Sequence, residues 1–334
     1  MTFQATIEYL YTRLPVFQNI GARAYKPGLH TTQAMCEALG NPQELYPCIH
    51  VGGTNGKGST SHMLAAILQK AGYKVGLYTS PHLKSFTERI RVNGVPVEEG
   101  YVIDFVKKSQ AQMDALEPSF FELTVAMAFS YFASQKVDIA VIEVGMGGRL
   151  DSTNIINPVL SLITNVSLDH TQFLGDTLAK IAIEKSGIIK PDVPVVISQR
   201  QQEGIAQAFE NKAKEMHAAL VFGSDRYRVQ SNGIHDGLLQ VSVSDALTGV
   251  ILYPNLQLAL TGNYQLLNIC GVLAAVETLR TLGFPIQLEA IETGLAEVIA
   301  ITGLKGRWQK LQDQPAVYCD TAHNYAGVSE TMAQ

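Results

Sequence analysis

The chain is poor in the residues that mark several classes of protein. Its 334 residues include four cysteines, and no two of them stand at the Cys-x-x-Cys spacing of a zinc or redox site. The sequence therefore predicts a reduced, cytoplasmic protein. A net charge of −5 leaves no surplus of basic residues for binding nucleic acid.

Long apolar runs are also missing. No run approaches the roughly 20 apolar residues that cross a bilayer, and residues 1–8 (MTFQATIE) lack the basic and apolar regions of a signal peptide. There is no internal repeat. The 46% hydrophobic and 16% charged residues predict a globular chain with a sizeable core. We expect a monomer that acts on small molecules, with no membrane or nucleic-acid partner.

Glycine, by contrast, is concentrated in the stretch 52–60 (GGTNGKGST). An apolar run at 48–51 precedes it and another at 63–68 follows, which predicts a strand, a loop and a helix. Glycines let successive backbone N–H groups face one space, the helix start adds partial positive charge, and Lys57 can reach the same space. The stretch therefore predicts a site for the phosphates of a nucleoside triphosphate, with a glycine-rich turn that binds no ligand as the alternative.

Beyond this loop, predicted strands and helices alternate along the chain. This order favours an α/β fold of the P-loop type, with a doubly wound, mostly parallel sheet. Short alternating stretches between 218 and 260, broken by Asn232-Gly233 and Asp236-Gly237, predict a small antiparallel appendage. Strands are expected at 74–79, 137–144, 159–164 and 194–197, a hairpin around Asn93-Gly94, and helices at 98–116, 119–135, 176–186 and 264–282.

Three polar residues stand at or just beyond the ends of predicted parallel strands: Ser80, Glu143 and His170. Ligands of open α/β sheets sit at this edge, so all three should face the same crevice as Lys57. Mg²⁺ prefers oxygen ligands, which the Glu143 carboxylate and the Ser80 hydroxyl can supply. His170 is an unusual magnesium ligand, and it could instead orient a neighbour such as Asp169.

The glycine loop departs from the usual G-x-x-x-x-G-K-[ST] pattern, because Val51 takes the first glycine position and Gly58 separates Lys57 from Ser59. In this spelling it resembles the phosphate loop of the Mur ligase superfamily, and most closely that of the folylpolyglutamate synthase and dihydrofolate synthase family. The resemblance covers nearly the whole chain. Further matching stretches are 78–83 (YTSPHL), 88–90 (ERI), 121–124 (FELT), 142–154 (IEVGMGGRLDSTN), 168–170 (LDH), 183–190 (IEKSGIIK), 306–308 (GRW) and 320–324 (DTAHN).

The resemblance implies an ATP-dependent ligase that adds L-glutamate to dihydropteroate, to the γ-carboxylate of a folate, or to both, through an acyl phosphate. Two Mg²⁺ ions are implied, with Ser80, Glu143 and His170 as ligands. Lys57, His170 and Lys185 are the implied catalytic residues. The implied nucleotide-binding residues are Thr54, Asn55, Gly56, Lys57, Gly58, Ser59, Asn268, Arg307 and Asp320.

Two assignments have a plain structural alternative. The resemblance implies that Lys185 is carbamylated by CO₂; the alternative is a surface lysine paired to an acid such as Glu184. The family's pterin-bearing substrate would lie along three segments, whereas 120–124 could simply supply core packing and a capping acid. The implied substrate residues are Pro27, Gly28, Leu29, Phe121, Glu122, Leu123, Thr124, Leu150, Asp151 and Ser152.

We expect residues 1–298 to form the ATP-binding, Mur-ligase-like central domain. Residues 294–306 read as a linker, and 299–334 as that linker plus the incomplete beginning of a second, Rossmann-like glutamate-ligase domain, which needs about 50–150 residues. If the protein ends at Gln334, ligation should be very weak. A non-catalytic ATP-binding module and a cell-wall precursor ligase are the alternatives. A P-loop switch protein would carry an N-K-x-D motif, and the sequence has none.

Overall fold

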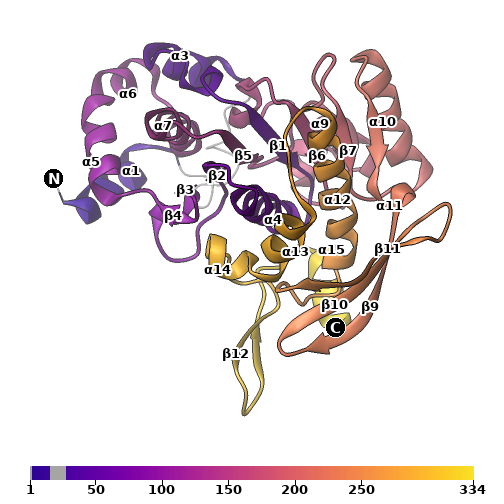
Figure 1. The fold of residues 1–334 in the computed structure, drawn as a ribbon. Coiled ribbons are helices and arrows are strands. Elements are labelled where there is room, and N and C mark those ends of the chain that lie inside the picture. The colour runs from indigo at the N-terminus through magenta and orange to yellow at the C-terminus, as the bar shows by residue number, and fades with distance from the viewer. Residues whose placement is uncertain (1, 16–27) are drawn as a thin grey trace.

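The computed structural model describes residues 2–15 and 28–334, and at its centre is an eight-stranded sheet (Figure 1). The strand order is β4-β3-β2-β5-β1-β6-β7-β8. The strands from β2 to β8 in this order pair in parallel, while β3 and β4 join antiparallel at one edge, which confirms the predicted doubly wound sheet. The strands are β1 (Cys48–Gly52), β2 (Val75–Tyr78), β3 (Ile90–Val92), β4 (Val95–Pro96), β5 (Ile139–Glu143), β6 (Leu160–Ile163), β7 (Val195–Ile197) and β8 (Leu220–Phe222).

The central strands are buried on both faces, as parallel strands covered by helices must be. Alternate residues of β1 point to opposite sides: Ile49 and Val51 join one core cluster, and Cys48 joins another. Because β1 lies between β5 and β6, the loops that follow these three strands meet at one edge of the sheet. β2 to β5 lie on one side of β1 in the sheet and β6 to β8 on the other, so the strand order reverses at β1. Open α/β sheets bind ligands at such a point.

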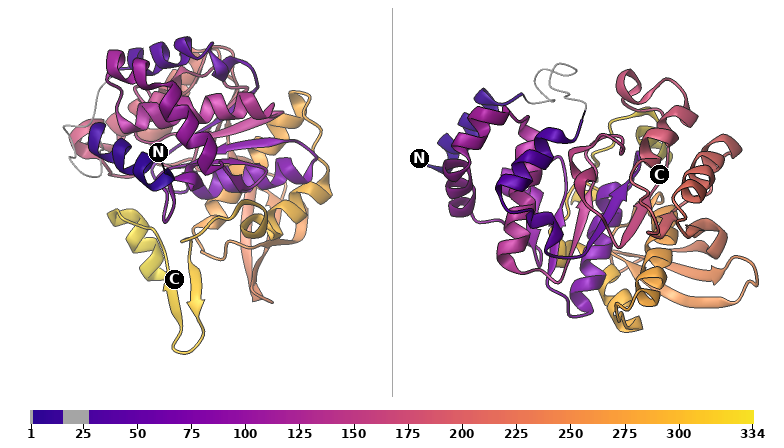
Figure 2. Two further views of the ribbon diagram at one scale, coloured as in Figure 1. Left: turned by 90° about the vertical axis from the view of Figure 1, so that its left-hand side faces the viewer. Right: turned by 90° about the horizontal axis from the view of Figure 1, so that it is seen from above.

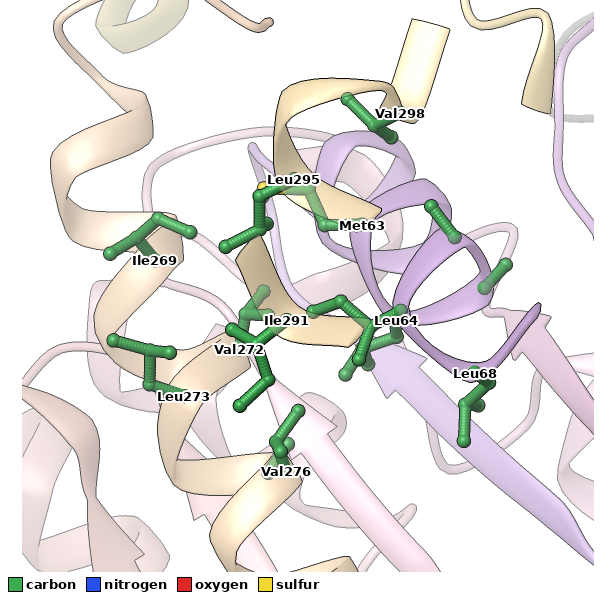
Figure 3. Close-up of a cluster of buried hydrophobic side chains, with 14 of the residues drawn as sticks. Met63, Leu64, Leu68, Ile269, Val272, Leu273, Val276, Ile291, Leu295 and Val298 are labelled. Carbon is green, nitrogen blue, oxygen red and sulfur yellow. The ribbon is translucent and has the colours of Figure 1, made fainter. Parts of the chain in front are cut away.

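Helices form a layer on each face of the sheet, as the views in Figure 2 show. One layer contains α4 (Lys57–Lys70), α12 (Gln265–Thr281), α13 (Leu288–Ala296) and α14 (Val298–Thr302), and Figure 3 shows their apolar side chains packed together. The opposite face carries the remaining long helices. These are α1 (Phe3–Arg13), α3 (His30–Ala38), α5 (Glu99–Lys108), α6 (Gln110–Leu116), α7 (Phe120–Gln135), α9 (Leu178–Ser186) and α10 (Glu203–Glu215).

The predicted linker over 294–306 is wrong for residues 294–302, which lie in α13 and α14 except for Glu297 between them. Gly294 was the misleading signal. A Cβ at this position would lie 2.7 Å from Cα of Ile67, so the glycine allows α13 to approach α4 closely. Val298 is fully buried, and the expected domain boundary after it falls inside α14.

The antiparallel appendage is confirmed as a three-stranded sheet in the order β11-β10-β9. Its strands are β9 (Tyr227–His235), β10 (Leu238–Asp245) and β11 (Ile251–Leu258). Asn232-Gly233 was expected to be a turn but lies within β9, where the pairing shifts register and Gly233 adopts φ +98°. This is the behaviour of a β-bulge, and the turn is at Asp236-Gly237.

Residues 305–334, called the C-terminal segment below, follow α14 and project from the main body (Figure 2). They form a hairpin of β12 (Gln309–Gln312) and β13 (Val317–Cys319), then α15 (Tyr325–Ala333). No residue of α15 is buried. Cys319 is partly exposed, whereas the other three cysteines are buried. Within the described ranges, none of the helices has the length and hydropathy to span a membrane.

The shorter helical elements lie in the connections between the longer helices and strands. They are η2 (Pro42–Glu44), η3 (Phe86–Arg89), η4 (Ser152–Ile155), α8 (Thr171–Leu174) and α11 (Gly223–Arg226). Two of them begin with a side-chain cap: Ser85 starts η3 in a capping box with Glu88, and Asp151 caps η4. These caps fix the loops that follow β2 and β5.

Candidate active site

The glycine loop turns between β1 and α4 through two positions that only glycine can occupy. Gly53 adopts φ +134°, and a Cβ there would lie 1.9 Å from Thr164 Oγ1. Gly56 adopts φ +85°, and its Cβ would lie 2.3 Å from Asn268 Oδ1. Both positive φ values and both close approaches exclude a side chain. The loop is therefore shaped by its neighbours as well as by its own sequence.

Hydrogen bonds fasten this loop to the segment after β6. Thr54 N donates to Asn165 O at 2.8 Å, Asn55 N donates to Asn165 Oδ1 at 3.0 Å, and Thr164 Oγ1 donates to Asn55 O at 2.5 Å. Lys57 Nζ donates to Gly53 O at 3.1 Å and Thr54 O at 3.0 Å. The lysine is thus held over the loop, where a phosphate would lie.

The additional glycine of the loop, Gly58, faces two charged side chains from other parts of the chain. A Cβ on Gly58 would lie 3.0 Å from Arg307 Nη2 and 3.7 Å from Glu143 Oε1. Any side chain here would fill the space between the loop, β5 and the C-terminal segment. The departure from the usual phosphate-loop spelling thus has a steric reason.

The loop opens into a cavity of about 930 Å³ at the carboxyl edge of the sheet. All residues predicted from the sequence to bind nucleotide or metal, or to act in catalysis, line this one cavity, although they come from eight separate stretches of the chain. They are Thr54, Asn55, Gly56, Lys57, Gly58, Ser59, Ser80, Glu143, His170, Lys185, Asn268, Arg307 and Asp320.

Glu143 and Ser80 meet at the ends of β5 and β2. Ser80 N donates to Glu143 Oε2 at 3.1 Å, and Oε1 accepts no hydrogen bond from the described residues. Burial raises the pKa of the Glu143 carboxyl, and the charge of Lys57 opposes this rise. A buried carboxylate with an open oxygen beside a hydroxyl suits Mg²⁺. Within residues 2–15 and 28–334, no three His, Cys, Asp or Glu side chains form a metal-binding group, so the hydroxyl, water and the nucleotide would supply further ligands.

His170 stands at the start of α8 with φ +47°. Its Nε2 lies 3.8 Å from Asp169 Oδ1, so the two side chains are close, as the alternative interpretation of His170 expected. Burial lowers the pKa of His170, while Asp169 raises it and Lys57 lowers it further. A neutral imidazole is the form that can bind a metal.

Lys185 is not a surface lysine. Its side chain is 3% exposed, and Nζ donates to Gly53 O at 2.8 Å, directly behind the glycine loop. Burial, followed by the nearby charge of Lys57, lowers the pKa of Lys185 to about 7. Its expected surface partner, Glu184, instead pairs with Arg149 at 2.9 Å. A neutral amine is therefore available at physiological pH, and CO₂ reacts with that form.

The C-terminal segment closes one side of the cavity. Asp320 accepts hydrogen bonds from Tyr264 Oη at 2.6 Å and Trp308 N at 2.7 Å. Asn324 and Asn55 exchange side-chain amide bonds at 2.9 and 3.1 Å, so the segment contacts the glycine loop directly. On α12, Asn268 is buried and donates to Gln265 Oε1 at 2.8 Å.

At the other end of the cavity, the structure brings together five of the ten predicted substrate residues: Phe121, Glu122, Leu150, Asp151 and Ser152. Leu123 and Thr124 are fully buried in the core instead, because they follow the capped start of α7. Glu122 is itself a cap, accepting from Ser119 N at 2.7 Å. Gly28 and Leu29 do not line the cavity, and Pro27 lies outside the described residues.

Several cavity residues were given no role from the sequence, and four of them are basic: His62, His82, Arg89 and Arg91. Arg89 lies in the matching stretch 88–90, and both arginines lie just before the hairpin predicted at Asn93-Gly94. Neither pattern shows which side chains point into the cavity. His62 lies four residues after Gly58, on the same face of α4, and this spacing is the signal that could have found it. Burial and the nearby Arg91 lower the pKa of His62 to about 3.

Comparisons with known proteins agree with this geometry. The Mur ligase middle domain family matches residues 51–276. The dihydrofolate synthase/folylpolyglutamate synthase of Bacillus subtilis (strain 168) is 36% identical over 329 residues, which cover 92% of this chain and 73% of the relative.

Solved structures match in fold as well as in sequence. Mycobacterium tuberculosis folylpolyglutamate synthase (FPGS) complexed with ADP has a TM-score of 0.85 and 33% identity, covering 98% of this chain and 72% of that chain. An FPGS complex with AMPPCP and folate has a TM-score of 0.89 and 30% identity, and the match covers 100% of this chain and 80% of that chain. The chain therefore belongs to the dihydrofolate synthase/folylpolyglutamate synthase family of proteins with a Mur ligase middle domain.

Proposed function

We propose that this chain carries out the ATP-dependent ligation of L-glutamate to dihydropteroate or to a folate, releasing ADP and phosphate. The observation that carries the proposal is the single cavity, which joins the glycine loop at one end to Phe121 and Asp151 at the other. Aromatic faces suit a flat bicyclic ring, and an acidic group can accept its N–H donors. The similar protein of Bacillus subtilis is named for this reaction, and similar solved structures are complexes with a nucleotide or with a nucleotide and folate. Both observations support the same reaction.

The proposed reaction has two steps. A carboxylate oxygen of the acceptor attacks the γ-phosphorus of ATP, the bond to the bridging oxygen breaks, and ADP leaves. The glutamate amine then attacks the acyl phosphate and loses a proton, and phosphate leaves. Positioning and charge neutralisation carry phosphoryl transfer, and Lys57 with the loop N–H groups supplies both.

Mg²⁺ would be held by Glu143 and Ser80, with His170 at a second position. When bound, it would neutralise charge on the triphosphate. Arg307, Asn268 and Asp320 would complete the nucleotide site. The two side chains contributed by the C-terminal segment are Arg307 and Asp320, so this segment would share in ATP binding. Monomeric state and cytoplasmic location stay predictions.

Lys185 carbamylation is part of the proposal. The neutral amine would take up CO₂ and release one proton, becoming an anionic carbamate behind the glycine loop. Its burial and its pKa of about 7 support this, because they favour the neutral amine. NMR with ¹³C-bicarbonate tests it: a carbamate signal should appear in the wild-type protein and be absent from Lys185→Met.

An assay of ADP release and product formation with ATP, glutamate and either dihydropteroate or tetrahydrofolate tests the function. It should be run on the 334-residue chain and on a chain extended to the length of the Bacillus relative. Ligation of either acceptor supports the proposal, and the ratio of the two rates assigns the acceptor. ATP binding without ADP release in both chains would instead favour the non-catalytic module.

A further inference from the structure

Arg89 lies in the wall of the cavity, between its nucleotide end and its aromatic end. It is the last residue of η3, and its carbonyl accepts from Thr79 N at 3.0 Å, which places it beside the carboxyl end of β2. The next residue of that loop, Ser80, contacts Glu143. On the other side, the guanidinium carbon of Arg89 lies 5.3 Å from the centre of the Phe120 ring.

The burial of Arg89 lacks the usual compensation. Its side chain is 3% exposed, yet no carboxylate of the described residues lies within the 4.0 Å of an ion pair. Arginine is seldom buried so completely without a partner, because a buried charge loses its hydration. The neighbouring Glu88 is turned away, accepting backbone N–H groups of residues 83–85 at 2.9–3.2 Å. An anion supplied by a ligand would complete the site.

The orientation of Arg89 is set by a chain of contacts. Nε donates to His82 Nδ1 at 2.8 Å, so Nδ1 is the unprotonated nitrogen of that ring. A neutral His82 then carries its proton on Nε2, which lies 3.3 Å from Tyr11 Oη and can donate to it. Phe120, stacked on Tyr11 with ring centroids 4.9 Å apart, covers one face of the guanidinium. The two terminal nitrogens of Arg89 make no hydrogen bond to the described part of the chain.

We propose that these two terminal nitrogens bind the carboxylate of the acceptor substrate, the group that receives the phosphoryl group from ATP. The planar fork of a guanidinium matches a carboxylate with two parallel hydrogen bonds. The position fits: aromatic residues for a flat ring lie on one side of Arg89, and the glycine loop lies beyond Glu143 on the other. The inference rests on the proposed function and names its carboxylate-binding residue.

A cycle of protein and ligand changes tests this without turnover. The probes are pteroate and its carboxamide, with binding to the full chain measured by calorimetry in the absence of ATP. The wild-type protein should prefer the carboxylate by about 10- to 100-fold, the usual range for a charged hydrogen-bonded pair. In Arg89→Gln this preference should fall to about 1, while Arg89→Lys keeps part of it. An unchanged ATP Kd and circular dichroism spectrum show that the variants fold.

A carboxylate preference that persists in Arg89→Gln overturns the proposal. So does a variant that keeps the preference but raises the KM for glutamate, because Arg89 would then serve the carboxylates of the amino acid. Failure of the wild-type protein to bind either probe contradicts the proposed function itself.

The positioning role of His82 has its own test. His82→Asn keeps an oxygen acceptor for Arg89 Nε and should retain more of the carboxylate preference than His82→Leu. Equal loss in both variants would contradict the positioning of Arg89 by this ring.

Discussion

Two neighbouring regions of the chain are attached to the main body in different ways. Helices α13 and α14 are anchored by apolar side chains, and Ile291, Leu295 and Val298 are almost fully buried (Figure 3). The C-terminal segment that follows has one buried residue, Gly306. Hydrogen bonds from Asp320 and Asn324 link it to the body.

The contrast is energetic as well as geometric. Burial of a large apolar side chain contributes about 1.5–3 kcal/mol, whereas a typical hydrogen bond contributes about 1 kcal/mol net. The pair of Asn55 and Asn324 makes hydrogen bonds of this kind, the bond from Tyr264 to the Asp320 carboxylate contributes about 1.5–3 kcal/mol, and both pairs lie at the cavity. The helices should therefore unfold only with the body, while the C-terminal segment can detach from it. The cavity lies where these two kinds of attachment meet.

The largest effect should come from the apolar attachment. Ile291→Ala leaves a hole between α13 and α4 and should lower the free energy of unfolding by about 2–5 kcal/mol. Met332→Ala in α15, where the side chain is 80% exposed, is the control and should change it by less than about 0.5 kcal/mol. Urea unfolding followed by circular dichroism measures both. Similar losses of unfolding free energy in the two variants would contradict the difference in attachment between α13 and the C-terminal segment.

Nucleotide binding should depend more on the body than on the C-terminal segment. Lys57→Met removes the cation held over the glycine loop and should weaken ATP binding about 100-fold, or about 2.7 kcal/mol. Arg307→Met should weaken it about 10-fold, because that side chain is partly exposed. Lys310→Met, on the exposed face of β12, serves as the control. Titration calorimetry gives the three affinities, and a larger loss for Arg307→Met would reverse the order of the two regions.

Buried and exposed lysines should respond differently to pH. The pKa of Lys185 is about 7 in the fold and about 10.5 when unfolded, so between these values the unfolded chain binds more protons and stability rises with pH. From pH 7 to pH 9 the wild-type protein should gain about 2 kcal/mol relative to Lys185→Met. Lys57 lowers and Asp169 raises this pKa. Chemical unfolding at a series of pH values in CO₂-free buffer measures the gain.

Lys310→Met is the matched control for this pH series. Asp313 raises the pKa of exposed Lys310, so its proton is bound in both states over the whole interval. The difference between wild type and Lys310→Met should stay constant from pH 7 to pH 9. If the difference in unfolding free energy between wild type and Lys185→Met also stayed constant from pH 7 to pH 9, Lys185 would not be a neutral buried lysine.

The smallest effect should come from the polar attachment. Asn324→Ala removes the amide pair with Asn55 and the cap of α15, which accepts from Gly327 N at 2.9 Å. Loss of such a cap costs about 1 kcal/mol. We expect faster proteolysis within residues 305–334 and unchanged unfolding of the body, with exposed Ser329→Ala as the control. Limited proteolysis with mass spectrometry locates the cleavage.

The sequence predicted those features that depend on local patterns of residues. Strand, glycine loop and helix follow from glycine spacing and apolar periodicity, and every nucleotide-binding residue inferred by resemblance faces the predicted crevice. Gly294 was misread because a glycine that ends a helix and one that lets two helices touch look alike in a sequence. Asn232-Gly233 was misread in the same way, since a bulge and a turn both use positive φ.

Which side chains of the loop after β2 point into the cavity could not be predicted from the sequence, for another reason. Arg89 and His82 form a pair only because η3 folds back over Phe120, and no periodicity encodes that long-range packing. Leu123 and Thr124 show the converse: they belong to a matching motif, yet the capped start of α7 turns them into the core. A motif can mark a segment without saying which of its side chains touch the ligand.

The distribution of the four thiols gives the protein a built-in chemical reporter. Cys36, Cys48 and Cys270 lie inside the body, and Cys319 stands partly exposed at the end of β13, next to Asp320. A mild alkylating dye should therefore mark Cys319 first, without any engineered residue. The fluorescence of such a label would follow the movement of the hairpin against the cavity as nucleotide is added.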